Sequence, residues 1–252
     1  MTTAVPCCAF ARGLLLTCLA SLASADEAEY RVRIDVDQLF TDEWETRPSA
    51  SSFVIKVVPS WAPAAAARFR ELVESKFFDD TRIHAVMPGI LFQFGYPANA
   101  STLWQWQQRD DFFLPGSGLR RSGTPSNERG YVSFGTIMTD VLINEGMPAD
   151  NLHEQNPNTA AIKIVVNLEN NHPFNRWGLA PFGYIEDIAE PRVGDDIIER
   201  VIIPREKLSE EAIEAFGNAY LDEHAPTLTR ISRARLLPDG EPAAESGAKS
   251  EL

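Results

Sequence analysis

The sequence predicts a mainly β protein whose strands form a closed barrel capped by helices. Two observations favour this fold class. Many short stretches either alternate apolar and polar residues or are rich in Val, Ile, Phe and Tyr, and segments rich in Gly, Pro and Asn separate them. Few stretches are assigned to helices, and the two that are so assigned lie at residues 63–74 and 209–221. Many short strands with few helices are typical of such a barrel, and we expect a single domain over residues 26–237.

The first expected elements are two strands and a helix. Tyr30–Val36 alternates apolar and polar residues, which indicates a half-buried strand, and Phe53–Val58 indicates a second strand that Pro59 ends. Pro63 suits the first turn of a helix, which tolerates proline. Apolar residues then recur at helical spacing, at Ala66, Phe69, Leu72 and Val73. We therefore expect a helix over residues 63–74.

The remaining elements are expected in the second part of the chain. Strands are predicted around Ile83–Phe92, Gly130–Gly135, Ile162–Asn167 and Phe182–Ile185. The longest loops are expected at Ala98–Arg129 and Ile137–Asn158. A helix over Ser209–Leu221 and a strand over Thr229–Leu236 complete the expected domain.

Residues 1–25 have the pattern of a signal peptide. Arg12 precedes a short apolar run, and Ala23-Ser24-Ala25 provides small residues at the expected cleavage site before Asp26. The run is shorter than the roughly 20 apolar residues that cross a bilayer, so we favour cleavage over the alternative of an uncleaved anchor. The three cysteines, at positions 7, 8 and 18, all lie in this segment. We therefore expect no disulfide and no thiol chemistry after cleavage.

The other end of the chain is a polar tail, residues 238–252, that ends Lys249-Ser250-Glu251-Leu252. This ending is similar to the Lys-Asp-Glu-Leu retrieval signal of the endoplasmic reticulum. Asn99-Ala100-Ser101 is a glycosylation sequon, which only the secretory route could use. We expect a protein of the endoplasmic reticulum lumen, with secretion as the alternative.

Composition argues against several functions. The chain of 252 residues carries 36 acidic and 23 basic residues, a net charge of −13, which disfavours nucleic acid or an anionic membrane as a partner after signal cleavage. We find no Gly-x-Ser-x-Gly elbow and no phosphate-binding glycine loop. The four histidines, at positions 84, 153, 172 and 224, lack metal-ligand spacing and are expected in loops or at the surface. The paired acids at positions 79–80, 110–111 and 195–196 are expected in solvated turns. We expect no metal and no cofactor.

One segment carries a resemblance to a known family. Residues 83–95 read Ile-His-Ala-Val-Met-Pro-Gly-Ile-Leu-Phe-Gln-Phe-Gly, which resembles the cyclophilin signature Phe-His-Arg-Val-x-Pro-Gly-Phe-Met-x-Gln-x-Gly. Further segments resemble the family in the same order, at residues 58–72, 126–134, 167–183 and 217–221. The resemblance implies an eight-stranded antiparallel barrel closed by helices. It also implies a peptidyl-prolyl cis-trans isomerase that needs no cofactor and acts on proline-containing polypeptides.

The resemblance also places the active site. Cyclophilins bind the proline ring in an apolar pocket, and an Arg donates a hydrogen bond to the substrate backbone. Here Ala85 stands at the Arg position and Gln93 matches a Gln that binds the substrate carbonyl. Ile90 and Leu91 stand at the positions of a pocket Phe and Met. In an ungapped alignment, a second Gln, a second Phe, a Leu and a His of the family correspond to Lys163, Val165, Phe174 and Leu179.

The loss of the Arg leaves the function open. Arg82 is expected on the opposite face of the strand from Ala85. For Lys163 we expect a solvated lysine at the pocket rim, and the alternative is that Lys163 replaces the missing cation. The favoured hypothesis is an isomerase of weakened activity that assists protein folding in the secretory pathway. The others are an inactive module that binds proline-containing or extended peptides, and a scaffold within a larger lumenal complex.

Overall fold

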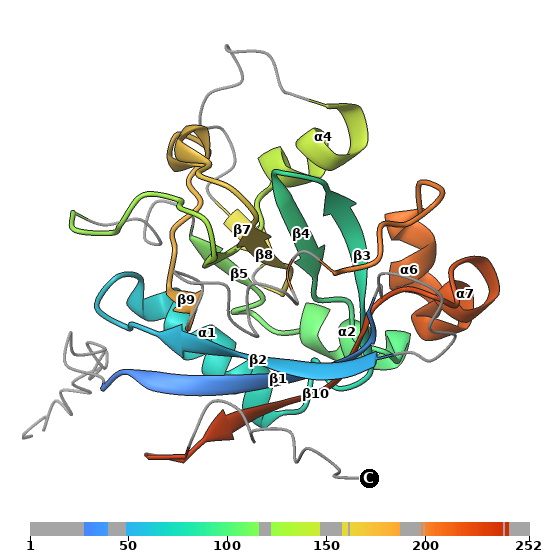
Figure 1. Ribbon diagram of the computed structural model, residues 1–252, viewed down its shortest axis with the longest axis horizontal. Helices are drawn as coiled ribbons and strands as arrows, with labels where there is room; N and C mark the ends of the chain where they lie inside the picture. Colours follow the sequence, from blue (N-terminus) through green and yellow to red (C-terminus); the bar gives the residue numbers. More distant parts are fainter. Residues whose placement is uncertain are drawn as a thin grey trace, which may run out of the picture.

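Eight antiparallel strands form a closed barrel in this protein (Figure 1), as expected. The computed structural model describes residues 28–39, 49–115, 122–146, 158–160, 162–186, 198, 200–238 and 240–241. The strands of the barrel are β1 (Tyr30–Leu39), β2 (Ser49–Val57), β3 (Thr81–Met87), β4 (Leu91–Phe94), β6 (Tyr131–Phe134), β8 (Ile164–Asn167), β9 (Gly183–Ile185) and β10 (Arg230–Leu237). Around the barrel they follow the order β1-β10-β3-β4-β8-β6-β9-β2. The expected signal segment, the retrieval-like ending, His153 and the acid pair at 195–196 lie outside the described residues.

The barrel interior is an aromatic and aliphatic core. On β1, Val32 and Ile34 are completely buried, while the residues on either side of each are partly exposed, so the predicted alternation holds. Helix α1 (Pro63–Glu74) begins and ends where the sequence predicts and buries Phe69 against the barrel. The Phe69 ring lies 5.0 Å from that of Phe182, and Phe182 lies 5.2 Å from Phe134 across the core. These ring contacts link α1 to β6 and to the chain just before β9.

Two segments expected to be long loops contain helices, which corrects the prediction. The first holds α2 (Ala100–Gln107), whose first turn is capped because the Asn99 side chain accepts a hydrogen bond from the Ser101 amide at 2.9 Å. The second holds α4 (Ile137–Glu145). The strand β5 (Phe113–Pro115) also falls in the first segment, and it pairs with β7 (Asn158–Ala160), which begins at the end of the second, in a separate two-stranded sheet. Loop-like composition around each helix hid its short apolar face.

Two other predicted elements are each divided by glycine. The strand expected around residues 83–92 is the β3–β4 hairpin, and Gly89 in its turn has a φ of 68°, which favours glycine. The helix expected over 209–221 is α6 (Glu210–Phe216) followed by α7 (Asn218–His224). Gly217 separates them with a φ of 59°, and a Cβ there would lie 2.5 Å from the Ala98 carbonyl oxygen. The close approach of α6 to the start of α2 therefore requires glycine at this position.

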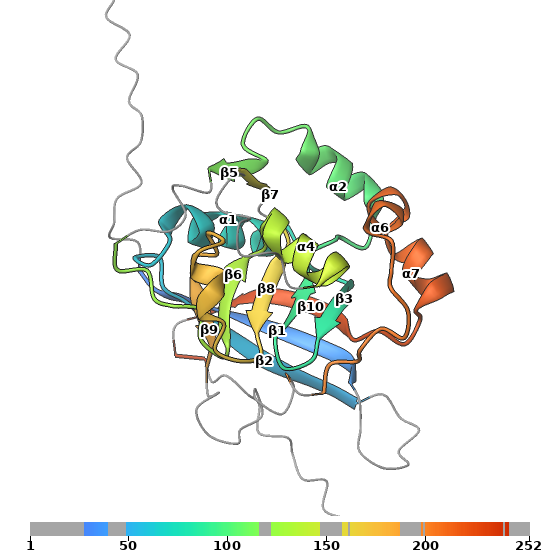
Figure 2. The same cartoon turned by 90° about the horizontal axis from the view of Figure 1, so that it is seen from above.

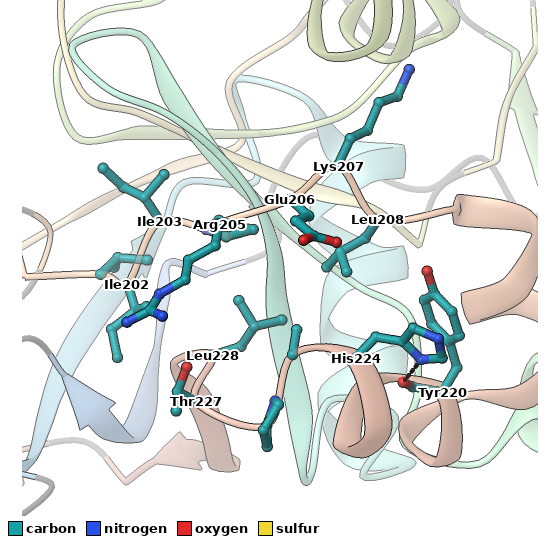
Figure 3. A pocket seen from close by; sticks show the side chains of 14 residues that line it. Ile202, Ile203, Arg205, Glu206, Lys207, Leu208, Tyr220, His224, Thr227 and Leu228 are labelled. Atoms are coloured by element: carbon teal, nitrogen blue, oxygen red, sulfur yellow. Dashed lines mark hydrogen bonds between the residues drawn. The ribbon is translucent and has the colours of Figure 1, made fainter.

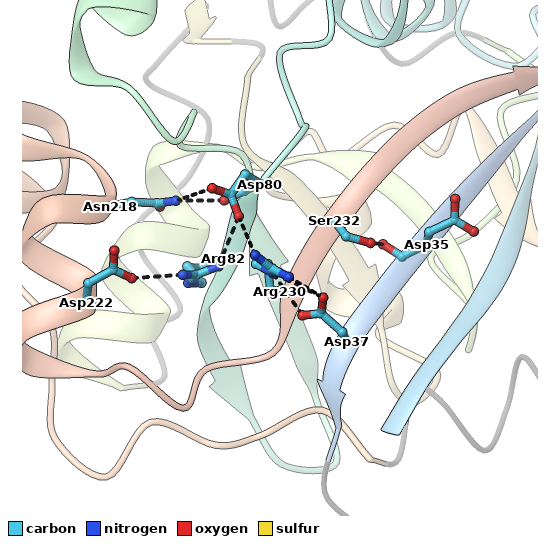
Figure 4. A network of polar contacts seen from close by, with 8 residues as sticks. All are labelled: Asp35, Asp37, Asp80, Arg82, Asn218, Asp222, Arg230 and Ser232. Carbon is cyan, nitrogen blue, oxygen red and sulfur yellow. Dashed lines mark hydrogen bonds and ion pairs between the residues drawn. The ribbon is translucent and has the colours of Figure 1, made fainter. Parts of the chain in front are cut away.

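A network of charged side chains ties α7 to the barrel (Figure 4). Arg230 of β10 pairs with Asp37 of β1 at 2.6 Å and with Asp80 at 3.2 Å. Arg82 of β3 pairs with Asp80 and, at 2.8 Å, with Asp222 of α7. Asp80 lies in a half-exposed turn, as predicted for the paired acids, but its carboxylate is shared by two guanidinium groups.

Across the described parts of the chain, no helix has the length and apolarity needed to cross a bilayer.

Candidate functional site

The β3–β4 hairpin places Ala85 and Gln93 side by side on the outer face of the barrel. The two strands pair Ile83 with Phe94 and Ala85 with Gln93, and the register shifts between these pairs. His84 is thus an extra residue in a β-bulge, which turns Ala85 outward while Ile83 still faces the core. Ala85 is 7% exposed and Gln93 is completely buried. The position equivalent to the family Arg therefore carries a covered methyl group.

Four of the predicted pocket residues come together next to this pair. Leu91, Val165, Phe174 and Leu179 form a buried cluster that is separate from the barrel core. Leu91 lies on β4, and Val165 lies on β8 opposite Gln93 of β4. Phe174 lies on the 3-10 helix η1 (His172–Asn175). Ile90, the remaining predicted pocket residue, packs at the edge of the same cluster. The structure thus brings the sequence-predicted pocket into one place and leaves none of these residues isolated.

Helix α4 covers this pocket, which sequence reasoning missed. Leu142 of α4 is completely buried in the same cluster as Leu91, Val165, Phe174 and Leu179, and Ile143 packs beside it. Figure 2 shows α4 lying across the outer side of β8 and the neighbouring β3–β4 hairpin. The apolar spacing within Ile137–Ile143 is the signal that could have predicted the helix. The side chain of Leu142 therefore packs among the residues that the resemblance predicts to line a pocket.

Lys163 is buried, which contradicts the expectation of a solvated lysine at the rim. Only 8% of the residue is exposed, and its Nζ lies 2.6 Å from Asp140 of α4 and 3.1 Å from Glu210 of α6. Burial alone would lower the pKa of Lys163, but the two carboxylates raise it above its ordinary value. Tyr96 donates a hydrogen bond of 2.7 Å to the same Glu210 carboxylate. Because both carboxylates contact the Lys163 ammonium group, that group is not free to donate a hydrogen bond to a substrate.

The environment of His84 also corrects the prediction of a loop or surface histidine. His84 lies in β3, is 4% exposed, and packs its ring 4.8 Å from the ring of Tyr96. Burial lowers its pKa to about 4, against a partly compensating effect of Glu210. The imidazole is therefore neutral at physiological pH. His172 and His224 are exposed, as expected.

Asparagine side chains hold the pocket wall in place, and sequence reasoning assigned them no role. Asn127 is completely buried and donates to the carbonyl oxygen of Leu179 at 3.1 Å. Asn171 donates to the carbonyl oxygen of Ile90 at 2.8 Å and to Asn167 at 2.9 Å. These bonds fix the segment that carries Phe174 against the β3–β4 turn. Amide side chains of this kind hydrogen-bond to backbone carbonyl groups in the turns between strands.

A separate cavity of about 830 Å³ lies between residues 201–208 and the end of α7 (Figure 3). Its walls include Ile202, Leu208, Tyr220 and Leu228, and none of the sequence-predicted site residues lines it.

In the described ranges, no group of three or more His, Cys, Asp or Glu side chains is arranged to hold a metal ion. The polar glycosylation candidate Asn99 lies elsewhere, exposed at the start of α2.

Comparison with known proteins identifies the family. The model of the family described as cyclophilin type peptidyl-prolyl cis-trans isomerase/CLD matches residues 43–191, and no curated protein matches the chain. A cyclophilin type isomerase from Cryptosporidium parvum, solved in the presence of the dipeptide Ala-Pro, is similar with a TM-score of 0.51 and 12% identity over 83% of this chain and 99% of that one. A second structure of that protein has a TM-score of 0.48 and 13% identity, covering 85% and 100%. The likeness to the first of these structures shows the shared fold, and the family model covers more than half of the sequence. The chain therefore belongs to the cyclophilin-type peptidyl-prolyl cis-trans isomerase family.

Proposed function

We propose that this protein is a cyclophilin-fold module that binds proline-containing polypeptides and isomerises them slowly or not at all. The observation that carries the proposal is the electrostatics of the pocket. Ala85 provides no donor where the family has its Arg, and the nearby cation, Lys163, is neutralised by Asp140 and Glu210. The apolar lining that would hold a proline ring is retained. The related C. parvum structure was obtained with Ala-Pro present, which agrees with this class of ligand.

The chemistry explains why catalysis should be lost before binding. Amide resonance gives the peptide bond a barrier of roughly 18–20 kcal/mol to rotation, so an isomerase must bind the twisted bond more tightly than either planar form. A hydrogen-bond donor aimed at the transition state typically contributes a factor of about 10²–10³ in rate. Affinity depends on the apolar pocket as a whole, and Leu91, Val165 and Phe174 would still offer that contact to a peptide that takes the place of Leu142.

The test compares the wild type with Ala85→Arg in a protease-coupled isomerisation assay on an Ala-Ala-Pro-Phe peptide. Ser232→Arg, which adds the same side chain at an exposed position of β10, is the matched control. We expect wild type and Ser232→Arg to stay near the uncatalysed rate, and Ala85→Arg to gain activity. Amide shifts of Ile90 and Leu91 on titration with the same peptide would support binding. Rapid turnover by the wild type would refute the loss of catalysis, and a titration without any shift would refute the binding.

We also propose that the protein acts in the lumen of the endoplasmic reticulum. The signal-like residues 1–25 and the ending Lys249–Leu252 support this location. The exposed Asn99, whose sequon lies at the start of α2, supplies a test. In a eukaryotic cell the full chain should stay inside and carry a glycan that endoglycosidase H removes, and Asn99→Gln should abolish the mass shift. Deletion of the last four residues should release the protein to the medium; an unglycosylated cytosolic chain would exclude a lumenal site.

A further inference from the structure

We propose that α4 is a displaceable cap, with Leu142 occupying the place of a substrate proline ring, so that peptides and α4 compete for one pocket. This inference rests on the proposed function, because it assumes that the uncovered pocket accepts proline. It adds the regulation of that site: the affinity for peptide is set by how often α4 leaves.

The apolar contacts show that α4 takes the ligand's place. Leu142 is completely buried although it lies on a helix at the outside of the barrel, and its cluster partners are the residues equivalent to the family pocket. Three of these partners, Leu91, Val165 and Leu179, are themselves completely buried. An apolar side chain of similar size to a proline ring therefore already excludes water from the pocket. A peptide could not enter while Leu142 remains there.

The charges around Lys163 make the removal of α4 feasible. Of the two carboxylates that contact this lysine, Asp140 belongs to α4 and Glu210 belongs to α6. If α4 leaves, Lys163 keeps Glu210, so no cation is left buried without a partner. Asp140 would move into water, where a carboxylate is well solvated. Breaking a buried ion pair is costly mainly when it leaves one charge buried without a partner, and the departure of α4 does not do so.

The intrinsic stability of helix α4 contributes little to keeping it on the barrel. It has nine residues, and isolated helices of that length are marginal in water. Its first turn is closed by the Thr139 side chain, which accepts from the Thr136 amide at 2.9 Å, and it ends at Gly146 with a φ of 90°. The contacts of Leu142 and Asp140 with the barrel therefore hold α4 down. Weakening either contact should open the pocket.

The experiment weakens each contact with a matched control. Leu142→Ala truncates the α4 side chain that occupies the pocket. Its control, Leu103→Ala, truncates a buried leucine of the similarly short helix α2, and this leucine packs in the barrel core instead. Asp140→Asn removes the carboxylate on α4, and Glu210→Gln removes the other carboxylate that contacts Lys163. For each protein we would measure the affinity for acetyl-Ala-Ala-Pro-Ala-amide. Hydrogen exchange of residues 137–146 would be followed with and without peptide.

We expect Leu142→Ala to shift the equilibrium toward the open form by about 100-fold, from the usual loss of packing in such a truncation. The apparent Kd should fall by the same factor until α4 is mostly open. Asp140→Asn should lower it by about tenfold. Leu103→Ala and Glu210→Gln should not tighten binding. In the wild type, peptide should accelerate hydrogen exchange in α4.

Two failures can be told apart. If Leu142→Ala speeds hydrogen exchange in α4 but neither protein binds the peptide, the pocket does not accept proline, and both the proposed binding function and the competition are refuted. If the peptide binds wild type and Leu142→Ala equally, and α4 stays protected in its presence, binding occurs elsewhere. The cap is then refuted while the binding function survives.

Discussion

The buried His84 should make the stability of this protein fall at mildly acidic pH. Burial holds its pKa at about 4, compared with 6.5 in the unfolded chain. The unfolded state therefore binds a proton more readily than the folded state, so stability is lost as pH falls from about 6.5 toward 4. With these two pKa values, the free energy of unfolding should drop by about 2 kcal/mol between pH 7 and pH 5 from this residue alone. Glu210 and Lys163 act on His84 with opposite signs, so burial decides the direction.

Urea unfolding of the wild type and of His84→Gln at pH 7, 6 and 5 measures this contribution. Glutamine keeps a polar side chain without a titratable group, so the difference between the two pH profiles isolates the histidine from the carboxylates that also titrate. His172→Gln, at an exposed position, is the control for losing a histidine. The wild type should lose about 2 kcal/mol more than His84→Gln over this range. Parallel profiles would show that the imidazole is accessible to protons in the folded state, which would refute its burial.

Two glycine substitutions should differ sharply in cost. Gly95→Ala should lower the free energy of unfolding by at least about 3 kcal/mol in urea, because its Cβ would lie 2.1 Å from the Ile162 carbonyl oxygen at a φ of 138°. Gly178→Ala should lower it by only about 1–2 kcal/mol, since its φ of 79° is strained for alanine but nothing lies within 4 Å of the added atom. Equal costs would mean that the close approach at Gly95 relaxes.

The sequence predicts the barrel well because each strand carries its own pattern. The alternation in β1 and the helical spacing in α1 are local signals, and the structure reproduces both. The expected helix over 209–221 breaks at Gly217 because that residue approaches the Ala98 carbonyl, a contact between segments that are distant in sequence. Helices α2 and α4 were missed for a related reason. Each buries only a few residues against the barrel, and that packing, rather than its own periodicity, stabilises it.

The site shows the same division between local and long-range information. The resemblance singled out Ala85 and a set of pocket residues, and the structure places Leu91 and Val165 of that set in one buried cluster. It could not reveal the fate of Lys163, because both of its partners, Asp140 and Glu210, come from other elements. A charged residue beside an apolar pocket can be solvated or paired, and only the fold decides which.

The loss of the Arg and the presence of α4 are physically consistent with each other. The resemblance assigns Ala85 and Leu179 to the family's Arg and His positions, and this assignment implies a pocket with two fewer polar groups. An uncovered patch of this kind would be exposed to water and prone to unwanted association. Leu142 removes it from water, while the pair of Asp140 with Lys163 gives the helix one defined position. Under the proposed function, in which the chemical step is slow or absent, such a cover is tolerable, because binding needs the pocket only when a competing peptide arrives.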